Sequence, residues 1–437
     1  MAAKKVLAGA RITMLNLSEY LPRVLDGVLA RALTLAGAVV VEGPRACGKT
    51  QTALWAGKSF ALLDDPATRE LVRLSPETVL EGESPRVLDE WQLATELWDL
   101  VRRAVDFGSS PGRFILTGSS VPADDATRHS GAGRFLRVRQ RTMSWWERGG
   151  SREDDAAGGV SVAGLFAGER PRAAPAVDDY ASVVDRLCSS GFPAMIALSP
   201  EDAQVLLRSY LREVTHTDLP RLEDMRHRPA VLEQLLRAVA RSVAQPVKFA
   251  RLAADLDQVA PGIAPATVAR YVELLERLFV VELQHPWAPK LRSRARLRSA
   301  DHMHMADPGL AVAALGASPE TLARDPETTG FLFESAVVHD LLVLGSPLDA
   351  RVECYHDSNE HEIDAVILLP DGRWGAVEVK VGGAQVGAGA ESLKKAIEQI
   401  DVSSVGEPAF RLVVTGNGGT FVLKDGTVTC PLSALMP

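Results

Sequence analysis

Two stretches of this sequence carry residue types and spacings that could do chemistry. Residues 43–50 read Gly-Pro-Arg-Ala-Cys-Gly-Lys-Thr, a complete GxxxxGK[ST] motif. In such a loop backbone N–H groups surround a phosphate, the lysine reaches the β and γ oxygens, and the hydroxyl residue ligates Mg²⁺. Residues 376–380, Ala-Val-Glu-Val-Lys, contain the Glu-x-Lys of a metal-dependent nuclease core. The sequence therefore predicts a triphosphate site early in the chain and a second site, built on a metal ion, late in it.

The residues around the loop have the order that a phosphate-binding loop needs. The apolar run at 36–42 predicts a buried parallel strand, and residues 49–56 predict the helix that follows the loop. The predicted nucleotide contacts are Gly43, Pro44, Arg45, Ala46, Cys47, Gly48, Lys49, Thr50 and Gln51. We expect ATP or ADP as the ligand, together with Mg²⁺ on Thr50, and we see no Asn-Lys-x-Asp signature for guanine.

Residues 86–92, Arg-Val-Leu-Asp-Glu-Trp-Gln, predict a second strand that ends in two acids. Strand ends meet at one edge of a parallel sheet, so both acids are expected beside the loop. Asp89 would complete the Mg²⁺ site and Glu90 would polarise the attacking water. The alternative is that Asp89 and Glu90 are the cap and first-turn acid of a helix at 92–105.

A third strand is predicted at 113–120, where small hydroxyl residues follow an apolar run. Thr117 is the candidate sensor of the γ-phosphate or of water. Arg134 follows a flexible Gly-Ala-Gly turn, where it would contact the nucleotide of a neighbouring copy as an arginine finger, in a homo-oligomer. The alternative is a surface arginine.

The late site rests on a hairpin. Strands are predicted at 355–366 and 374–381, and Pro-Asp-Gly at 370–372 suits a three-residue loop. That loop puts Asp364 opposite Glu378, and Lys380 shares their face. The carboxylates of Asp364 and Glu378, with Glu334 from a helix at 331–344, would hold Mg²⁺ or Mn²⁺, while Lys380 stabilises charge. The alternatives are a cross-strand ion pair on a solvated face, or a nuclease-like fold that only binds.

The series GPRxxGKT, LDEWQ, FILTGSS and GAGR resembles the prokaryotic AAA-like P-loop ATPases whose chains continue into a winged-helix region and a C-terminal nuclease-like domain. Gly-Phe-Pro at 191–193, Asp-Leu-Pro at 218–220, Asp-Pro-Gly-Leu at 307–310 and Glu334 are similar to that family's later landmarks. The resemblance covers nearly the whole chain and implies an α/β fold: a P-loop NTPase parallel sheet with helices on both faces, then a helical and winged-helix region, then a PD-(D/E)xK nuclease-like α/β domain.

Four domains are predicted in this order: an AAA-like ATPase domain at 1–177, a helical lid at 178–228, a winged helix-turn-helix at 229–288 and the nuclease-like domain at 289–437. The polar stretch at 148–177 is expected to be a linker or surface loop. Thr267, Arg270 and Tyr271 are expected on the recognition helix, for docking to either DNA or protein.

A row of cations at every second position, Lys290, Arg292, Arg294, Arg296 and Arg298, would lie on one face of a strand. A DNA or RNA backbone would match it, and a charged edge strand is the alternative. His302 and His304 alternate beside Asp307, and we expect surface or packing residues there in preference to a metal site.

Composition limits the classes of protein. With 437 residues, 46% hydrophobic and 24% charged, the chain can form several cores, in about two to four domains. A net charge of −8 argues against a generally basic nucleic-acid coat. The cysteines are far apart and no window reaches the ~18 apolar residues of a spanning helix. We therefore expect a cytoplasmic protein with no membrane span, no disulfide framework and no zinc site.

Overall fold

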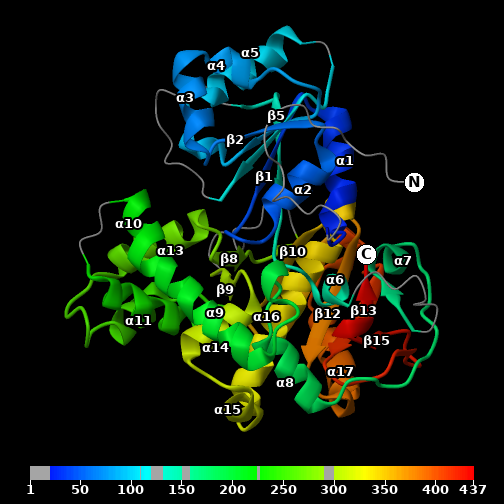
Figure 1. Ribbon diagram of the computed structural model, residues 1–437. Coiled ribbons are helices and arrows are strands. Elements are labelled where there is room, and N and C mark those ends of the chain that lie inside the picture. Colours follow the sequence, from blue (N-terminus) through cyan, green and yellow to red (C-terminus); the bar gives the residue numbers. More distant parts are fainter. Residues whose placement is uncertain (1–19, 109, 120–130, 150–157, 224–226, 290–299) are drawn as a thin grey trace. The chain divides into compact units, whose positions relative to one another are not determined.

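The computed structural model describes residues 20–108, 110–119, 131–149, 158–223, 227–289 and 300–437 (Figure 1). Contacts divide the chain into two compact units, Met1–Arg141 and Thr142–Pro437. Among the helices in these ranges, none has the length and apolar character needed to cross a membrane. All four cysteines are buried free thiols.

The first unit is built on a five-stranded parallel sheet. In spatial order the strands are β2 (Ser59–Leu62), β3 (Arg86–Asp89), β4 (Phe114–Gly118), β1 (Ala38–Glu42) and β5 (Phe135–Arg139). Residues Ala38 to Val41 of β1 are fully buried. Such a continuous apolar run is typical of a strand covered on both faces, because successive side chains point to opposite sides.

Helices pack on both faces of this sheet (Figure 1). They are α1 (Val24–Leu35), α2 (Lys49–Ala56), α3 (Pro66–Leu74), α4 (Pro76–Val79), the 3₁₀ turn η2 (Trp91–Leu93) and α5 (Leu97–Phe107). Val39 and Val41 belong to a core with α1 and α2, whereas Val40 belongs to a core with α5. This confirms the predicted α/β class with a parallel sheet and flanking helices. The expected helix at 92–105 is instead η2 followed by α5.

The second unit begins with residues that were expected to form a linker. Its first elements are α6 (Trp145–Arg148), β6 (Val160–Ser161) and α7 (Val162–Phe166). β6 pairs with β16 (Leu435–Met436), and the buried Phe166 ring meets Phe410 edge-on at 5.0 Å. The segment 158–166 is therefore packed structure, whereas residues 167–177 have no helix or strand and are mostly exposed, as expected for a surface loop. The contacts divide the chain after Arg141; the four predicted domains and their boundaries stay predictions.

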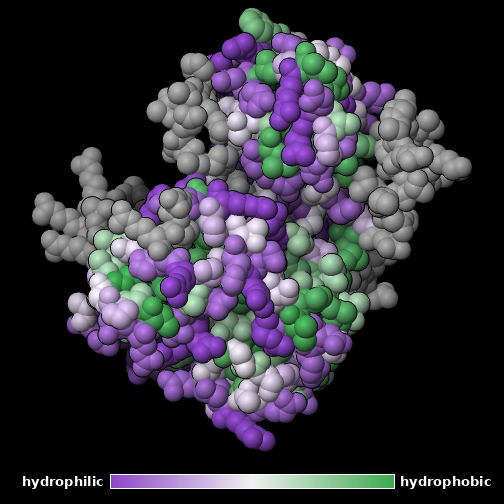
Figure 2. Space-filling model, turned by 60° about the vertical axis from the view of Figure 1, so that its left-hand side comes forward, coloured by the Kyte–Doolittle hydropathy of each residue, from purple (hydrophilic) through white to green (hydrophobic). Residues whose placement is uncertain are grey.

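A helical region follows. Its helices are α8 (Tyr180–Cys188), η3 (Pro193–Met195), α9 (Pro200–Glu213), the π-helical turn η4 (Val214–Asp218), α10 (Leu219–Leu222), α11 (Pro229–Ala240), α12 (Phe249–Asp255) and α13 (Pro265–Arg277). A small sheet of order β7-β9-β8 accompanies them, formed by Gln245–Pro246, His302–Met305 and Val281–Gln284. Val205 and Leu206 on α9 are exposed. On the face that Figure 2 shows, hydrophobic residues lie scattered among hydrophilic ones.

The rest of the second unit carries a six-stranded sheet of order β10-β11-β12-β13-β15-β14. The strands are β10 (Arg351–His356), β11 (Glu362–Leu368), β12 (Trp374–Lys380), β13 (Phe410–Thr415), β14 (Phe421–Val422) and β15 (Val428–Pro431). The helices and turns are α14 (Pro308–Leu315), α15 (Pro319–Ala323), α16 (Pro326–Leu344), η6 (Ser346–Leu348), η7 (Gly383–Gln385), α17 (Val386–Glu398), α18 (Val402–Val405) and η8 (Leu432–Ala434). The single strand expected at 355–366 is two strands, because the chain turns at 357–361.

Candidate functional site

The phosphate loop joins β1 to α2, as its sequence predicts. Gly43 can have no side chain, because an added Cβ would lie 2.0 Å from the carbonyl oxygen of Gln140. Gly48 has φ of 98°, a left-handed conformation that favours glycine. Lys49 is buried and donates its Nζ to the carbonyl oxygens of Gly43 at 2.9 Å and Pro44 at 2.7 Å. Its ammonium group is thus held inside the loop, where a phosphate would be bound.

Asp89 lies beside this loop at the end of β3. Its Oδ1 accepts hydrogen bonds from the Thr50 hydroxyl at 2.8 Å and the Thr117 hydroxyl at 2.6 Å. Burial raises the pKa of Asp89, and the two hydroxyl donors oppose that rise. The sheet order explains the contact with Thr117, since β4 is the direct neighbour of both β3 and β1 and its end lies beside Asp89 and the loop.

Glu90 follows with a φ of 56°, so the chain turns sharply at the strand end. Its backbone N–H donates to the Thr117 hydroxyl at 3.0 Å, and its Oε2 accepts from Ser119 at 3.1 Å and from the Gln92 amide. Glu90 makes no side-chain cap to η2, and Asp89 bonds hydroxyl groups instead of helix N–H groups. The geometry supports the catalytic alternative over the helix-cap alternative; the roles of Glu90 and Thr117 stay predictions.

Three residues that support the loop were missed by sequence reasoning. Arg23, buried before α1, donates to the carbonyl oxygens of Cys47 at 3.0 Å and Arg141 at 2.8 Å. The Gln140 amide also donates to Cys47 at 3.1 Å. The Tyr20 hydroxyl lies 3.1 Å from that of Thr52 on α2. No motif marks these residues, because they act through contacts distant in sequence.

Arg134 lies away from the loop of its own chain. Its carbonyl accepts from Ala38 at the start of β1, whereas the phosphate loop follows the end of β1. Its guanidinium pairs with Asp106 at 2.8 Å. No role on its own nucleotide fits this position, and the predicted contact with a neighbouring copy stays a prediction.

The late site has the predicted hairpin. β11 and β12 pair with Ala365 opposite Val377, so continuing the register by one position puts Asp364 opposite Glu378. The turn is closed by hydrogen bonds between Leu369 and Arg373 and between Gly372 and Leu369. Asp364 accepts from the backbone N–H of Val379 at 2.7 Å. The two carboxylates therefore lie on one face of the sheet.

Lys380 completes this face. Its Nζ lies 2.8 Å from Oε1 of Glu378, whose side chain is only 5% exposed. Burial raises the pKa of Glu378, although Lys380 opposes the rise. Burial lowers the pKa of Lys380, but the charge of Glu378, its hydrogen bond and the charges of the other two acids together outweigh burial, so the pKa is raised. Glu378 and Lys380 therefore form an ion pair in which Glu378 is shielded from water and Lys380 is partly exposed.

The pKa values of Asp364 and Glu334 are also raised. Burial and the charge of Glu378 raise the pKa of Asp364 to about 7. Burial, then the charges of Asp364, Glu362 and Glu378, raise the pKa of Glu334 well above its usual value. The structure thus brings Asp364, Glu378, Lys380 and Glu334 within electrostatic reach of one another. Within the described ranges, however, no three His, Cys, Asp or Glu side chains are already grouped as ligands of one metal ion.

The predicted recognition residues are engaged within the protein. Arg270 pairs with Glu223 and, at 2.8 Å, with Glu273. Tyr271 is buried and its hydroxyl lies 2.5 Å from Nδ1 of His227. The three helices α11, α12 and α13 and strand β8 match the predicted element order. Base reading by these two residues is not favoured. The charge of Arg270 is neutralised by Glu223 and Glu273, and the Tyr271 ring is packed in the interior.

His304 lies in the interior of the second unit. His304 is buried between Gln284 and Ser335, each at 3.1 Å, and burial lowers its pKa to about 3. Of the two expected roles, surface or packing, His304 has the packing role. The row Lys290, Arg292, Arg294, Arg296 and Arg298 lies outside the described residues.

Three protein-family models match parts of this chain. Residues 36–148 match the family model described as an AAA domain. Residues 180–321 and 329–435 match two models described as domains of unknown function, DUF8612 and DUF4143. Residues 36–148 are therefore similar to AAA domains, which agrees with a P-loop ATPase site in this part of the chain.

Similar whole chains add little on function. Uncharacterized proteins of Mycobacterium bovis and Mycobacterium tuberculosis are each 27% identical over 359 residues, covering 80% of this chain and 72% of theirs. Among solved structures, the Walker-type ATPase PabY2304 of Pyrococcus abyssi matches at 13% identity with a TM-score of 0.40, covering 68% of this chain and 96% of that one. A similarity this distant carries no argument about activity.

Proposed function

We propose that this protein binds and hydrolyses ATP with Mg²⁺, and that the nucleotide state controls a nuclease-like C-terminal domain that acts on DNA or RNA. The observation that supports the first part most directly is Asp89, whose one oxygen accepts from both Thr50 and Thr117. This contact joins the phosphate loop to the ends of two neighbouring strands. Hydrolysis needs such a constellation, because it depends on positioning and charge.

Each residue has a defined task in this proposal. The backbone amides of the loop and the Lys49 ammonium bind the β- and γ-phosphates. The Thr50 hydroxyl and the Asp89 carboxylate, 2.8 Å apart, are hard oxygen donors that fit a Mg²⁺ shell, and bound Mg²⁺ would neutralise phosphate charge. Glu90 orients the attacking water, and Thr117 positions both acids through its two hydrogen bonds.

Replacing Lys49 tests the nucleotide site. Lys49→Ala removes the buried ammonium, and ATP affinity should fall at least roughly tenfold because a charge-assisted contact is lost. Isothermal titration with Mg-ATP measures this. Lys58→Ala, at an exposed position one residue after α2's cap, is the matched control and should bind as wild type. Unchanged affinity of Lys49→Ala would refute the assignment of the loop.

The second part of the proposal rests on a different observation, the charged face formed by Asp364, Glu378, Lys380 and Glu334. Carboxylate oxygens suit Mg²⁺ or Mn²⁺, and a lysine beside them can stabilise the charge of a scissile phosphate. Asp364, with a pKa near 7, changes charge in the range where a metal ion would compete with the proton. The donor set fits a divalent cation that also draws ligands from substrate and water.

Cleavage assays test this part. Wild-type protein should nick labelled DNA or RNA with Mn²⁺ or Mg²⁺, and Glu378→Ala should abolish cleavage while ATP binding is retained. Glu391→Ala, an exposed glutamate on α17, is the matched control and should cleave normally. If wild-type protein cleaves none of the single- and double-stranded substrates, the nuclease assignment fails.

The competing function is a regulatory ATPase whose C-terminal domains bind protein partners without cleavage. Two observations favour it: Arg270 and Tyr271 are engaged internally, and the late acids are not pre-grouped as a three-ligand metal site in the described ranges. Pull-downs with and without nuclease treatment separate the two functions. Partners that survive the treatment support the regulatory function, and partners lost with it support nucleic-acid binding.

A further inference from the structure

An aromatic pair lies beside the phosphate loop. Trp55, on the loop's own helix α2, stacks on Tyr20 with ring centroids 5.0 Å apart and 16° between the planes. Trp55 nevertheless remains 53% exposed. Tryptophan is usually well buried, since its indole ring has a large apolar surface. A large aromatic surface at this position is therefore accessible to a flat ligand.

Hydrogen bonds hold the pair in place. The Tyr20 hydroxyl donates to Asp26 Oδ1 at 2.5 Å and lies 3.1 Å from the hydroxyl of Thr52. Arg23, three residues later, is bonded to the carbonyl oxygens of Cys47 in the loop and Arg141 after β5. Tyr20 is thus fixed against α2 on the side of the loop where β5 lies. Its ring supports that of Trp55 from behind.

The sheet order sets the direction of a bound nucleotide. β1 lies between β4 and β5, and Asp89 and Thr117 both belong to the β4 side. The γ-phosphate must face these residues, so the α-phosphate, ribose and base leave toward β5. Gln51 and Trp55 are four residues apart on α2 and so share one face of the helix. A base that extends past Gln51 comes within reach of Trp55.

We propose that Trp55, supported by Tyr20, is the platform on which the base of the bound nucleotide stacks. This inference rests on the proposed nucleotide site and adds the residue that binds the base. Aromatic stacking is tolerant of base identity because every base has a π-face. When an aromatic side chain that stacks on one base is replaced by alanine, affinity falls roughly five- to 150-fold.

Two ligands that differ only in the nucleoside test the proposal. Full-length wild-type protein, Trp55→Leu and Trp55→Phe are titrated with Mg-ATP and with inorganic tripolyphosphate, directly or by competition. Trp55→Leu keeps an apolar contact with Tyr20 but has no π-face, so ATP affinity should fall at least roughly fivefold. Tripolyphosphate affinity should be unchanged, and Trp55→Phe should retain most of the ATP affinity.

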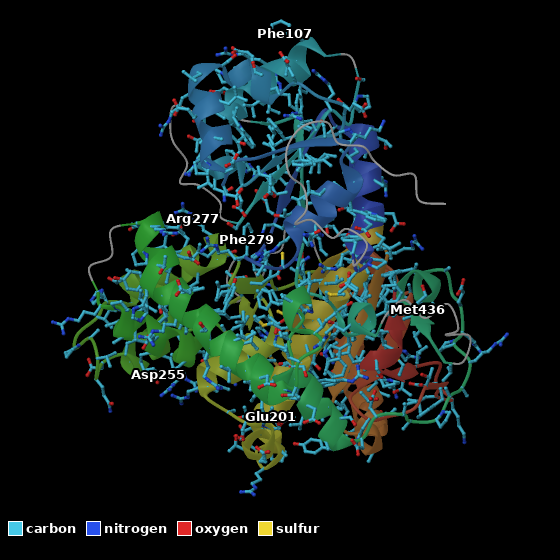
Figure 3. All side chains as sticks on the ribbon, viewed as in Figure 1. Phe107, Glu201, Asp255, Arg277, Phe279 and Met436 are labelled. Carbon is cyan, nitrogen blue, oxygen red and sulfur yellow. The ribbon has the colours of Figure 1, made fainter. Side chains whose placement is uncertain are left out.

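Phe107→Leu is the matched control. Phe107, labelled in Figure 3, is 90% exposed at the end of α5. Helix α5 leads into the N-terminal end of β4, whereas the phosphate loop follows the C-terminal end of the parallel strand β1, so Phe107 lies at the other end of the strands from the loop. Its replacement should change neither affinity. The proposal is overturned if Trp55→Leu binds ATP as wild type does, or if it loses ATP and tripolyphosphate equally. If wild-type protein binds neither ligand, the nucleotide site itself fails, and that result is distinct from a loss confined to ATP.

Discussion

The Thr117 hydroxyl donates to Oδ1 of Asp89 at 2.6 Å across 28 positions of sequence. The same hydroxyl accepts from the backbone N–H of Glu90 at 3.0 Å. One small side chain thus fixes both acids at the end of β3. It can do so because β4 and β3 are neighbours and run parallel.

Thr117→Val should slow hydrolysis while the fold is retained. Valine has nearly the same shape but neither donates to Asp89 nor accepts from Glu90. A hydrogen bond to a charged group is worth about 1.5–3 kcal/mol, which corresponds to roughly ten- to 100-fold in kcat. The pKa of Asp89 should also rise, because one of the donors that lowers it is gone. The acid limb of the pH–rate profile should therefore move to higher pH.

The exposed Thr34 supplies the control for this experiment. Thr34→Val should leave kcat and the pH profile as in wild type. A Thr117→Val protein with an unshifted profile and unchanged kcat would show that the hydroxyl does not position the acids.

Glu90→Gln should separate binding from hydrolysis. The substitution keeps the side-chain shape and its contact with Ser119 but removes the base. We expect kcat for ATP to fall by about 100-fold or more, with the Kd for ATP within a few-fold of wild type. Phosphate release and equilibrium titration measure the two quantities. Glu96→Gln, exposed near the start of α5, should change neither; near-normal hydrolysis by Glu90→Gln would exclude Glu90 as the base.

Asp364 should make the stability of the second unit fall as pH rises from about 4 to about 7. Its folded pKa of about 7 lies above the value of about 3.9 in an unfolded chain. Between these pH values the folded state binds a proton that the unfolded state has lost, so the free energy of unfolding decreases with pH and then levels off. Urea denaturation with a chelator present, in wild type and Asp364→Asn, should show that the variant lacks this component. Asp371→Asn, at an exposed turn position, should keep it; parallel curves for wild type and Asp364→Asn would contradict the raised pKa.

The same proton should oppose metal binding at the late site. Below pH 7 a cation must displace the proton from Asp364, so Mn²⁺ affinity should rise by up to about tenfold per pH unit until pH 7. Calorimetric titration with Mn²⁺ between pH 5.5 and about pH 8 measures this affinity. The Lys49→Ala variant is used so that changes at the phosphate loop do not contribute to the signal. Affinity that does not vary with pH would place the metal ion elsewhere.

Lys380→Met should destabilise the second unit because Glu378 would lose its partner in a shielded position. An unpaired buried charge costs about 1–3 kcal/mol, toward the lower end here since Lys380 is partly exposed. The double variant Glu378→Gln with Lys380→Met should recover much of this loss, which a urea-denaturation cycle measures. Lys395→Met, from an exposed pair with Glu391 at 3.8 Å, should change stability by no more than about 0.5 kcal/mol. Additive single effects would show that Glu378 and Lys380 do not interact.

Local features of both sites could be predicted from sequence because each depends on short stretches of chain. The loop, its strand and its helix are contiguous, so glycine spacing and an apolar run were sufficient, and α2 begins and ends as predicted. The three-residue turn at 370–372 likewise sets the pairing of β11 with β12, and thus the positions of Asp364 and Glu378. The strand expected at 355–366 was wrong, because alternating apolar residues do not mark a turn at 357–361.

Contacts between distant segments could not be predicted in this way. Arg23 and Gln140 reach the loop only because α1 and β5 pack beside β1. Arg270 is neutralised by Glu223, which precedes it by 47 positions. Sequence alone assigns the apolar residues at 160–166 to a polar insertion. Their role depends on the pairing of β6 with β16, which lies at the far end of the chain.

The sequence by itself determined which reactive groups are present and their local geometry. These are a phosphate loop with its helix, acids at strand ends, and a hairpin in which Asp364 lies opposite Glu378. The tertiary structure decided which of these groups meet, since the strand order β2-β3-β4-β1-β5 brings Thr50 and Thr117 to the same carboxylate oxygen of Asp89. It also decided the charge of the late acids, because their pKa values depend on burial and on neighbouring charges from separate helices and strands. Local spacing determines backbone geometry, whereas burial and long-range pairing are properties of the packed chain.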